Sequence, residues 1–188
     1  MNELLLNSHD DHESIIDDLL VSGLSTFDDV LRVVQQLPYG RNENRFDPEL
    51  VWTERMGTCS SKHAFLKKLA TEQGFESVKL ILAVYKMNNK NTPGIGNVLE
   101  NSTLPYVPEA HCYISINGER IDVTFPDSDI KKLMPDILEE QFIEWSDVGT
   151  FKVEYHQEFI KKWLKTEDIS LSFEEVWEIR EKCIAALA

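Results

Sequence analysis

The side chains best suited to chemistry are a cysteine, a histidine and an aspartate that lie far apart in the chain: Cys59, His111 and Asp122. Cys59 follows a Gly-Thr pair at the predicted start of a helix, and that helix extends to about residue 73. The unpaired N–H groups and the positive dipole end of a helix N-terminus both favour a thiolate. Cys59 is therefore a candidate nucleophile, and the alternative is a buried structural cysteine, which is a common environment for free thiols.

A β-hairpin is predicted around Asn117-Gly118, because Asn-Gly between alternating runs is the strongest short-range hairpin signal. A two-residue turn sets the pairs Ile116–Glu119, Ile114–Ile121, Tyr113–Asp122 and His111–Thr124. One face is then apolar and is expected to pack on the core: Cys112, Ile114, Ile116, Ile121 and Val123. The other face is polar: His111, Tyr113, Ser115, Arg120, Asp122 and Thr124.

This register makes His111 and Asp122 diagonal neighbours on the polar face of the hairpin. A carboxylate there can bond one imidazole nitrogen and leave the other nitrogen to pair with a thiol. A three-residue loop would instead move Asp122 to the apolar face. The alternative is an ordinary solvated face that happens to carry a histidine and an aspartate.

The elements needed to position these residues can be placed by hydrophobic spacing. Helices are predicted over 15–21, 27–37, 159–164 and 173–187, with a short helix over 129–133; Ser25 or Thr26 can cap the second. Strands are predicted over 78–87, 151–155 and in the hairpin 110–125, whereas 39–52 and the long segment 88–109 are expected to be irregular. This order, with helices followed by a strand, a hairpin and more helices, indicates an α+β fold with a small antiparallel sheet. We expect one domain over 1–188. Residues 1–13 are expected to be disordered or frayed.

The composition of the chain indicates which classes of partner and which cellular compartment to expect. The 188 residues carry a net charge of −14 and no basic run, so nucleic acid and anionic membranes are not expected partners. No stretch approaches the roughly 18 apolar residues of a membrane helix, and the N-terminus lacks the pattern of a secretory signal. Three cysteines are too few for a disulfide framework. Together with the other features of composition, this predicts a cytoplasmic protein. No cofactor is expected.

The same residues resemble the transglutaminase-like superfamily, whose core is similar to a reduced papain fold. The segment from Gly57-Thr58-Cys59 through Gly74-Phe75 is similar to the family's nucleophile helix, and Leu37-Pro38-Tyr39 to the element before it. His111 and the run Ile121-Asp122-Val123-Thr124 are similar to the family's His and Asp strands. The resemblance implies a helix packed on a small antiparallel sheet, with Cys59 as nucleophile, His111 as general base and acid, and Asp122 as the orienting carboxylate.

Two rival sites use the same side chains. Cys59, His63, His111 and Cys112 could be counted toward a zinc ion, but His111 and Cys112 point to opposite faces of a strand and cannot easily grip one ion. His63 leans toward Cys59 on the helix and could act as its base. No carboxylate can be inferred to orient His63, so a packed or supporting role is the better interpretation.

The expected chemistry is cleavage or exchange of an amide, peptide or thioester bond through an acyl-thioester on Cys59. The Cys59 N–H is one expected donor to the oxyanion, and Trp52 or an amide side chain from residues 35–44 could supply a second. The loop 88–109 is expected to shape the acyl pocket. The alternative is a catalytically inactive module of the same fold that uses its cleft to bind a peptide or protein.

Overall fold

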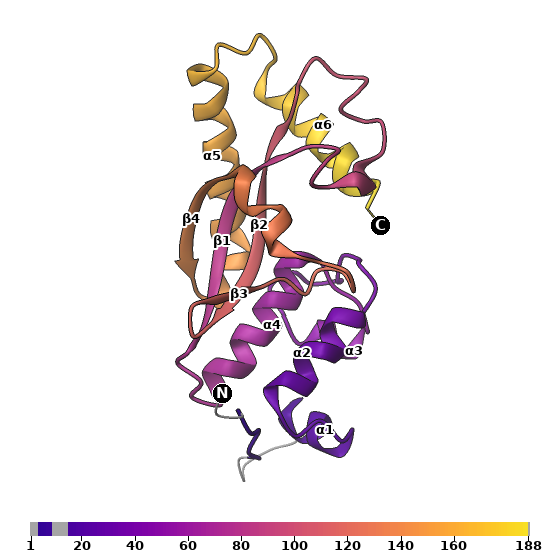
Figure 1. Cartoon of the computed structure of the whole chain (residues 1–188), viewed down its shortest axis with the longest axis vertical. Coiled ribbons are helices and arrows are strands. Elements are labelled where there is room, and N and C mark those ends of the chain that lie inside the picture. The colour runs from indigo at the N-terminus through magenta and orange to yellow at the C-terminus, as the bar shows by residue number, and fades with distance from the viewer. Residues whose placement is uncertain (1–3, 9–14, 188) are drawn as a thin grey trace. The chain divides into compact units, whose positions relative to one another are not determined.

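The computed structural model describes residues 4–8 and 15–187, and its architecture is mixed α+β, as the sequence predicts. A small four-stranded antiparallel sheet has the strand order β3-β2-β1-β4. Its strands are β1 (Val78–Met87), β2 (Val107–Ile116), β3 (Glu119–Ile121) and β4 (Ile137–Ile143). The helices in Figure 1 are α1 (Ile15–Val21), α2 (Phe27–Gln36), α3 (Leu50–Thr53), α4 (Cys59–Glu72), α5 (Thr150–Thr166) and α6 (Phe173–Ala185).

The chain divides into two compact units. The first comprises residues up to 81 together with 112–128 and 142–148, and it contains α1 to α4. The second comprises residues 82–111 and 129–141 and the chain from 149 onward, and it contains α5 and α6. Strands β1, β2 and β4 each contribute residues to both units.

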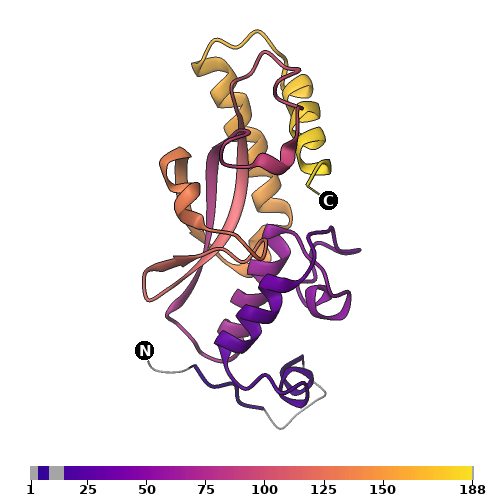
Figure 2. The same ribbon diagram turned by 45° about the vertical axis from the view of Figure 1, so that its right-hand side comes forward.

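Helix α4 is the centre of the first unit. Helices α2 and α3 both pack against it, as the two views in Figures 1 and 2 show. Helix α2 begins with a capping box, in which the Asp29 N–H donates to Thr26 Oγ1 (3.1 Å) and the Thr26 N–H donates to Asp29 Oδ2 (3.1 Å). Of the two predicted candidates for the cap, Ser25 and Thr26, the structure therefore shows Thr26. Next to it, Phe27 meets Phe75 edge to face, with ring centroids 6.0 Å apart, which fixes α2 beside the end of α4.

Part of the N-terminal segment predicted to be frayed is held against the start of α2. Leu6 N–H donates to Ser25 O and Phe27 N–H donates to Leu4 O, both at 2.9 Å, and the Leu6 side chain is buried. Residues 1–3 and 9–14 of the same predicted segment lie outside the described residues.

The hairpin has the predicted two-residue turn. Asn117 and Gly118 both have positive φ angles (52° and 86°), and the ladder pairs Ile114 with Ile121 and Ile116 with Glu119, which confirms the register. Strand β3 nevertheless ends at Ile121, so the pairs predicted further along, Tyr113–Asp122 and His111–Thr124, are not part of this ladder. The β2 residues of the face predicted to be polar are also not solvated, because β2 is an inner strand of the sheet and is buried on both faces from residue 107 to 115, whereas Arg120 of β3 is exposed.

Helices α5 and α6 lie side by side in the second unit. The short strand predicted over 151–155 is wrong, because those residues belong to α5. Their alternating apolar pattern imitates a strand, but the residues that α5 buries are Lys152, His156, Ile160 and Trp163, at helical spacing. Strand β4 and helix α3 were not predicted, since β4 is an edge strand rich in glutamate and α3 has only four residues.

The segment between β1 and β2 is irregular, as predicted, apart from a 3₁₀ turn at Pro93–Ile95. It is well anchored in the second unit. Ile95, Leu99 and Leu104 are buried, and the Asn91 side-chain amide donates to Lys86 O (2.8 Å) and to Asp136 Oδ2 (2.7 Å). A role for this segment in shaping an acyl pocket stays a prediction.

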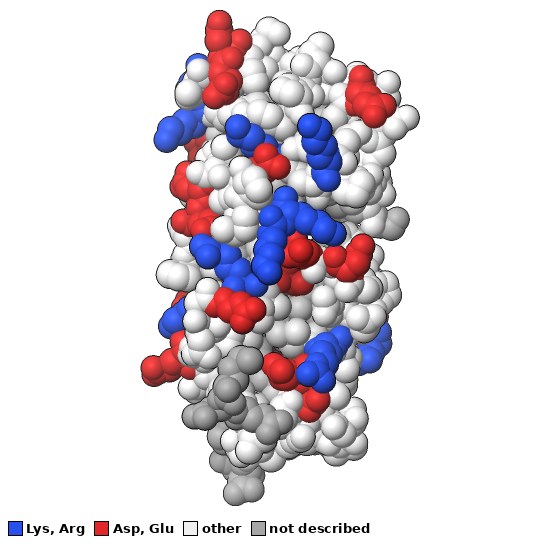
Figure 3. Space-filling model, viewed as in Figure 1, with Lys and Arg blue, Asp and Glu red and all other residues white. Residues whose placement is uncertain are grey.

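Two features bear on the partners that the composition leads us not to expect. Basic and acidic side chains are interspersed on the face drawn in Figure 3, unlike the single basic surface that nucleic-acid-binding proteins present. Within residues 4–8 and 15–187, every helix falls short of the length or the hydropathy that a bilayer crossing requires.

Candidate functional site

Cys59 is the first residue of α4, where the sequence predicts it. The helix starts with a capping box: Thr58 N–H donates to Ser61 Oγ (2.9 Å), and Ser61 N–H donates to Thr58 Oγ1 (3.3 Å). This reciprocal pair fixes the first turn, so the thiol has a defined position at the positive end of the helix dipole. Cys59 is partly exposed, whereas Cys112 and Cys183 are buried. The accessible thiol among the three is therefore the one at the helix start.

The chain approaches Cys59 through a glycine that is tightly enclosed. Gly57 N–H donates to Pro38 O (3.1 Å), and Gly57 O accepts from Gly40 N–H (3.4 Å). A Cβ atom at Gly57 would lie 2.9 Å from both Lys62 Cγ and Ser61 Oγ, closer than real contacts allow. A glycine is required here to leave room for the side chains of the first turn of α4.

Lys62 is a site residue that sequence reasoning missed. Its side chain is fully buried, and its ammonium donates to three main-chain carbonyls: Leu37 O (2.6 Å), Thr124 O (2.8 Å) and Val123 O (3.4 Å). Burial lowers the pKa of Lys62 to about 8, while the negative charges of Asp122 and of a Cys59 thiolate act to raise it. At pH 7 this lysine is largely protonated. The sequence feature that could have indicated Lys62 is its position three residues after Cys59, on the same side of the helix.

His63 is a packing residue, as the sequence interpretation preferred. It is fully buried, and both ring nitrogens are engaged. Nδ1 lies 2.7 Å from Cys59 O, and Nε2 accepts the Val123 N–H at 2.9 Å. These partners require a neutral ring with the proton on Nδ1, so His63 has no free nitrogen with which to serve as a base.

Asp122 is buried directly after β3. Its Oδ1 accepts from the Thr124 N–H (2.9 Å) and from Thr124 Oγ1 (2.6 Å). Asp122 Oδ1 also lies 3.7 Å from His63 Nε2. The local turn closed by Thr124 fixes the carboxylate in place, so its orientation comes from this turn and not from the strand ladder that the sequence suggested.

His111 belongs to the second unit, whereas Cys59 and Asp122 belong to the first. It lies on β2 with only 8% of its surface exposed, and its ring meets Tyr85 nearly edge to face, with centroids 5.9 Å apart. The imidazole is thus held by its own strand and by β1. The pairing of Cys59 with His111, and of His111 with Asp122, stays a prediction.

A buried ion pair lies two residues before His111 on β2, and no pattern in the sequence indicates it. Glu109 accepts from Arg180 of α6 through both carboxylate oxygens, Nε to Oε2 (2.7 Å) and Nη2 to Oε1 (2.6 Å). Burial alone would raise the pKa of Glu109, but the charges of Arg180, His156 and Lys152 outweigh it and hold that pKa at about 2. The pair fastens α6 to β2 across 71 residues of sequence.

His156 of α5 completes the cluster. Its Nε2 lies 2.8 Å from Pro108 O and 3.9 Å from Glu109 Oε2, and its ring packs against Trp177 with centroids 5.3 Å apart. Burial lowers the pKa of His156, and Glu109 acts in the opposite direction. Cys183 is buried nearby, and its burial together with the Glu109 charge raises the pKa of its thiol to about 11, which makes it an inert cysteine.

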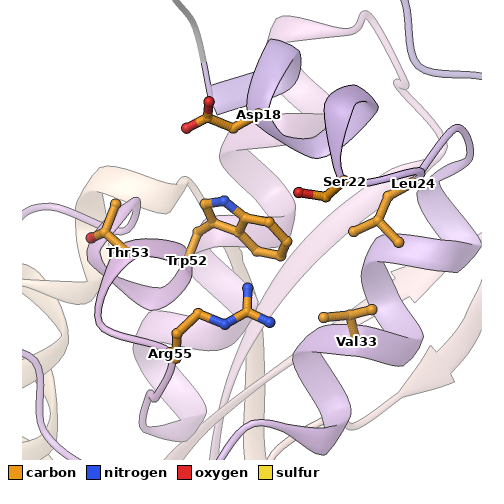
Figure 4. Close-up of a pocket in the computed structure, with 7 residues that line it drawn as sticks. All are labelled: Asp18, Ser22, Leu24, Val33, Trp52, Thr53 and Arg55. Atoms are coloured by element: carbon orange, nitrogen blue, oxygen red, sulfur yellow. The ribbon is translucent and has the colours of Figure 1, made fainter.

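The first unit also has a surface pocket of about 570 Å³. Figure 4 shows the Trp52 indole among the residues that line it, which are Asp18, Ser22, Leu24, Val33, Trp52, Thr53 and Arg55. The Arg55 guanidinium lies over the Trp52 ring, 4.2 Å from its centroid. Trp52, a predicted second oxyanion donor, thus lines a pocket whose lining does not include Cys59.

Two of the amide side chains predicted as alternative oxyanion donors are engaged elsewhere. Asn42 Nδ2 donates to Met56 O (3.0 Å) and Glu54 Oε2 (2.9 Å), which secures the chain just before Cys59. Gln35 Nε2 donates to Pro126 O (3.3 Å). Within the part of the chain that the structure describes, no group of three or more histidine, cysteine or acidic side chains could hold a metal ion.

Comparison of this chain with protein-family models, with curated proteins and with solved structures finds no match in any of the three.

Proposed function

We propose that this chain is a cysteine-dependent acyl-transfer enzyme that acts on an amide, peptide or thioester bond, with a transglutaminase-like core. The observation that carries the proposal is the environment of Cys59, a partly exposed thiol at the capped start of α4 with a buried ammonium three residues further along the helix. A helix N-terminus and a nearby cation both favour the thiolate, which is the nucleophilic form. The other two cysteines have neither the exposure nor this position.

In the proposed reaction, Cys59 transfers its thiol proton to His111, and the resulting thiolate attacks the acyl carbon, so that a C–S bond forms as the carbonyl oxygen becomes an oxyanion. The oxyanion collapses and expels the leaving amine or thiol, which takes a proton from His111. His111 then removes a proton from water or from an acceptor amine, which attacks the thioester and releases the thiolate. Asp122 is proposed to orient His111, and its fixed carboxylate suits that role.

The first test measures the pH dependence of iodoacetamide alkylation at Cys59, with the labelled peptide identified by mass spectrometry. We expect half-maximal reactivity below the pH of about 8.5 at which a free cysteine titrates. We also expect His111→Ala to shift the profile toward that value. Buried Cys112 and Cys183 serve as internal controls, because they should stay unlabelled in the folded protein.

A second test searches for an acyl adduct. After exposure to cell extract, the wild-type protein should gain a mass on Cys59 that hydroxylamine removes, as expected for a thioester, and Cys59→Ser should not gain that mass. An alkylation profile equal to that of a free cysteine, unchanged in His111→Ala, would contradict the enzyme. That result would instead favour a catalytically inactive binding module.

A further inference from the structure

Lys62 is an unusual buried charge because its partners are main-chain carbonyls. Among the described residues no carboxylate lies within ion-pair distance of its Nζ, and the side chain is fully buried. A buried ammonium is expensive unless it is paired or fully hydrogen-bonded. Here all three N–H donors have a carbonyl acceptor. The interior of the first unit therefore holds a positive charge at Lys62, at a position where an apolar side chain could also fill the space.

The Lys62 ammonium connects two parts of the candidate site in the first unit, namely the start of α4 at Cys59 and the turn that follows Asp122. Lys62 follows Cys59 by three residues, so the two side chains share one side of α4. Two of its three acceptors, Val123 O and Thr124 O, come directly after Asp122. The enclosed Gly57, whose missing Cβ leaves room for Lys62 Cγ, shows that the local chain is built around this side chain.

We propose that Lys62 is a positioning residue of the thiol site: its buried ammonium favours the thiolate form of Cys59 and fastens the Asp122 turn to helix α4. This inference rests on the proposed function for its purpose, since a stabilised thiolate serves a nucleophile. Its physical content, an electrostatic coupling between Lys62 and Cys59, does not require turnover of any substrate.

The other charged groups near Lys62 are few. Asp122 is the anion that acts on it besides Cys59, and its carboxylate is held by Thr124. His63, the next residue on α4, accepts the Val123 N–H at its Nε2, so that nitrogen carries no proton in this arrangement. The Lys62 ammonium is thus a buried positive charge of α4 that interacts with both Cys59 and Asp122.

The first experiment compares the alkylation profile of Cys59 in wild-type, Lys62→Met and Lys67→Met proteins. Lys67 is the matched control, because it is also a buried lysine of α4 and its Nζ lies 3.5 Å from Val78 O, one to two turns beyond Lys62. We expect Lys62→Met to move the profile up by about one pH unit or more, which lowers the rate near neutral pH about tenfold. Lys67→Met should leave the profile in place even if it lowers the melting temperature.

A merely structural Lys62 would give a different result, in which Lys62→Met lowers the melting temperature and the alkylation profile stays at the wild-type pH. That outcome overturns the proposal.

A second measurement keeps the proposal testable if Lys62→Met does not fold. Coupling between two titrating groups is reciprocal, so removing the thiolate must change the titration of the lysine. NMR titration of ¹³C-labelled lysine side chains in wild-type and Cys59→Ser proteins should show that Lys62 releases its proton at lower pH in the variant. An identical titration in both proteins would contradict the coupling. An absent acyl adduct with the coupling present would reject the enzyme and leave the inference standing.

Discussion

At the scale of single residues, the site depends on a close approach at Gly57. An added Cβ would lie 2.9 Å from Lys62 Cγ and from Ser61 Oγ and 3.1 Å from Val51 Cγ2. We expect Gly57→Ala to lower the free energy of unfolding by about 1–3 kcal/mol, the usual cost of overpacking. It should also move the Cys59 alkylation profile upward, because Lys62 must shift.

The matched control for this substitution is Gly94→Ala. A Cβ at Gly94 would meet Leu187 Cδ2 alone, the end of a flexible side chain that can move aside. Urea unfolding should therefore show a change within about 0.5 kcal/mol. Equal stability losses in the two variants would show that the enclosure of Gly57 is not what limits substitution there.

The sequence was sufficient to predict Cys59 at the start of a helix, but it placed Asp122 on the strand ladder, whereas β3 ends at Ile121 and Asp122 lies in the turn that follows. Cys59 could be predicted at a helix start because capping and stop signals are local. The Asp122 turn closed by Thr124, and the Lys62 ammonium bonded to carbonyls 25 and 62 residues away, depend on tertiary packing. Lysine is a surface residue by default, so its burial could not be inferred from its type.

At the scale of elements, the Asn117-Gly118 turn sets the register of β2 and β3. Gly118 has a φ angle of +86°, and nothing lies within 4 Å of a Cβ built on it. The cost of Gly118→Ala therefore comes from backbone conformation alone, and we expect a loss of about 1 kcal/mol in the free energy of unfolding. Asn117→Gly should change stability by less than about 0.5 kcal/mol, since glycine adopts the φ angle of 52° without strain.

Urea unfolding of the two hairpin variants measures this difference. A Gly118→Ala protein as stable as Asn117→Gly would mean that the turn tolerates a side chain at a left-handed position. In that case the register would depend on the packing of β2 and not on the turn.

Elements with strong local signals were predicted, and those without them were not. The bounds of β1 and α1 match the predicted ranges, and α4 ends before Gly74, which has a φ angle of +70°. The segment 151–155 was misread because two periods compete over five residues, and only the continuation of α5 to Thr166 decides between them. Strand β4 carries two adjacent glutamates, which mask its strand character.

At the scale of the whole molecule, the predicted triad is distributed over two compact units. Cys59 and Asp122 belong to the first unit and His111 to the second, while β1, β2 and β4 contribute to both. No short-range pattern can predict how the chain divides, because the division depends on contacts between segments far apart in sequence. The chain carries a net charge of −14, and a buried ion pair, Glu109–Arg180, lies in the second unit.

The Glu109–Arg180 pair should dominate the acid sensitivity of the fold. The pKa of Glu109 is about 2 in the folded protein and 4.5 for an unperturbed glutamate. The unfolded chain therefore binds the proton first as pH falls, so the stabilisation is complete above pH 4.5 and is lost between about pH 4.5 and 2. The shift corresponds to about 3 kcal/mol. His156, whose pKa is also lowered, acts in the same direction as pH falls below its ordinary value of 6.5.

We expect Glu109→Gln to lower the free energy of unfolding at pH 7 by about 3–5 kcal/mol, because it leaves the Arg180 charge buried without its partner. Stability of the variant should also vary less between pH 5 and 3 than that of the wild type. Glu178→Gln removes an exposed glutamate of α6 that pairs with Lys182, and it should cost less than about 1 kcal/mol and keep the wild-type pH dependence. Urea unfolding at a series of pH values measures both quantities.

A Glu109→Gln protein that keeps the wild-type loss of stability between pH 5 and 3 would show that other carboxylates cause the acid sensitivity. The buried pair would then hold α6 against β2 without setting the pH range in which the fold survives.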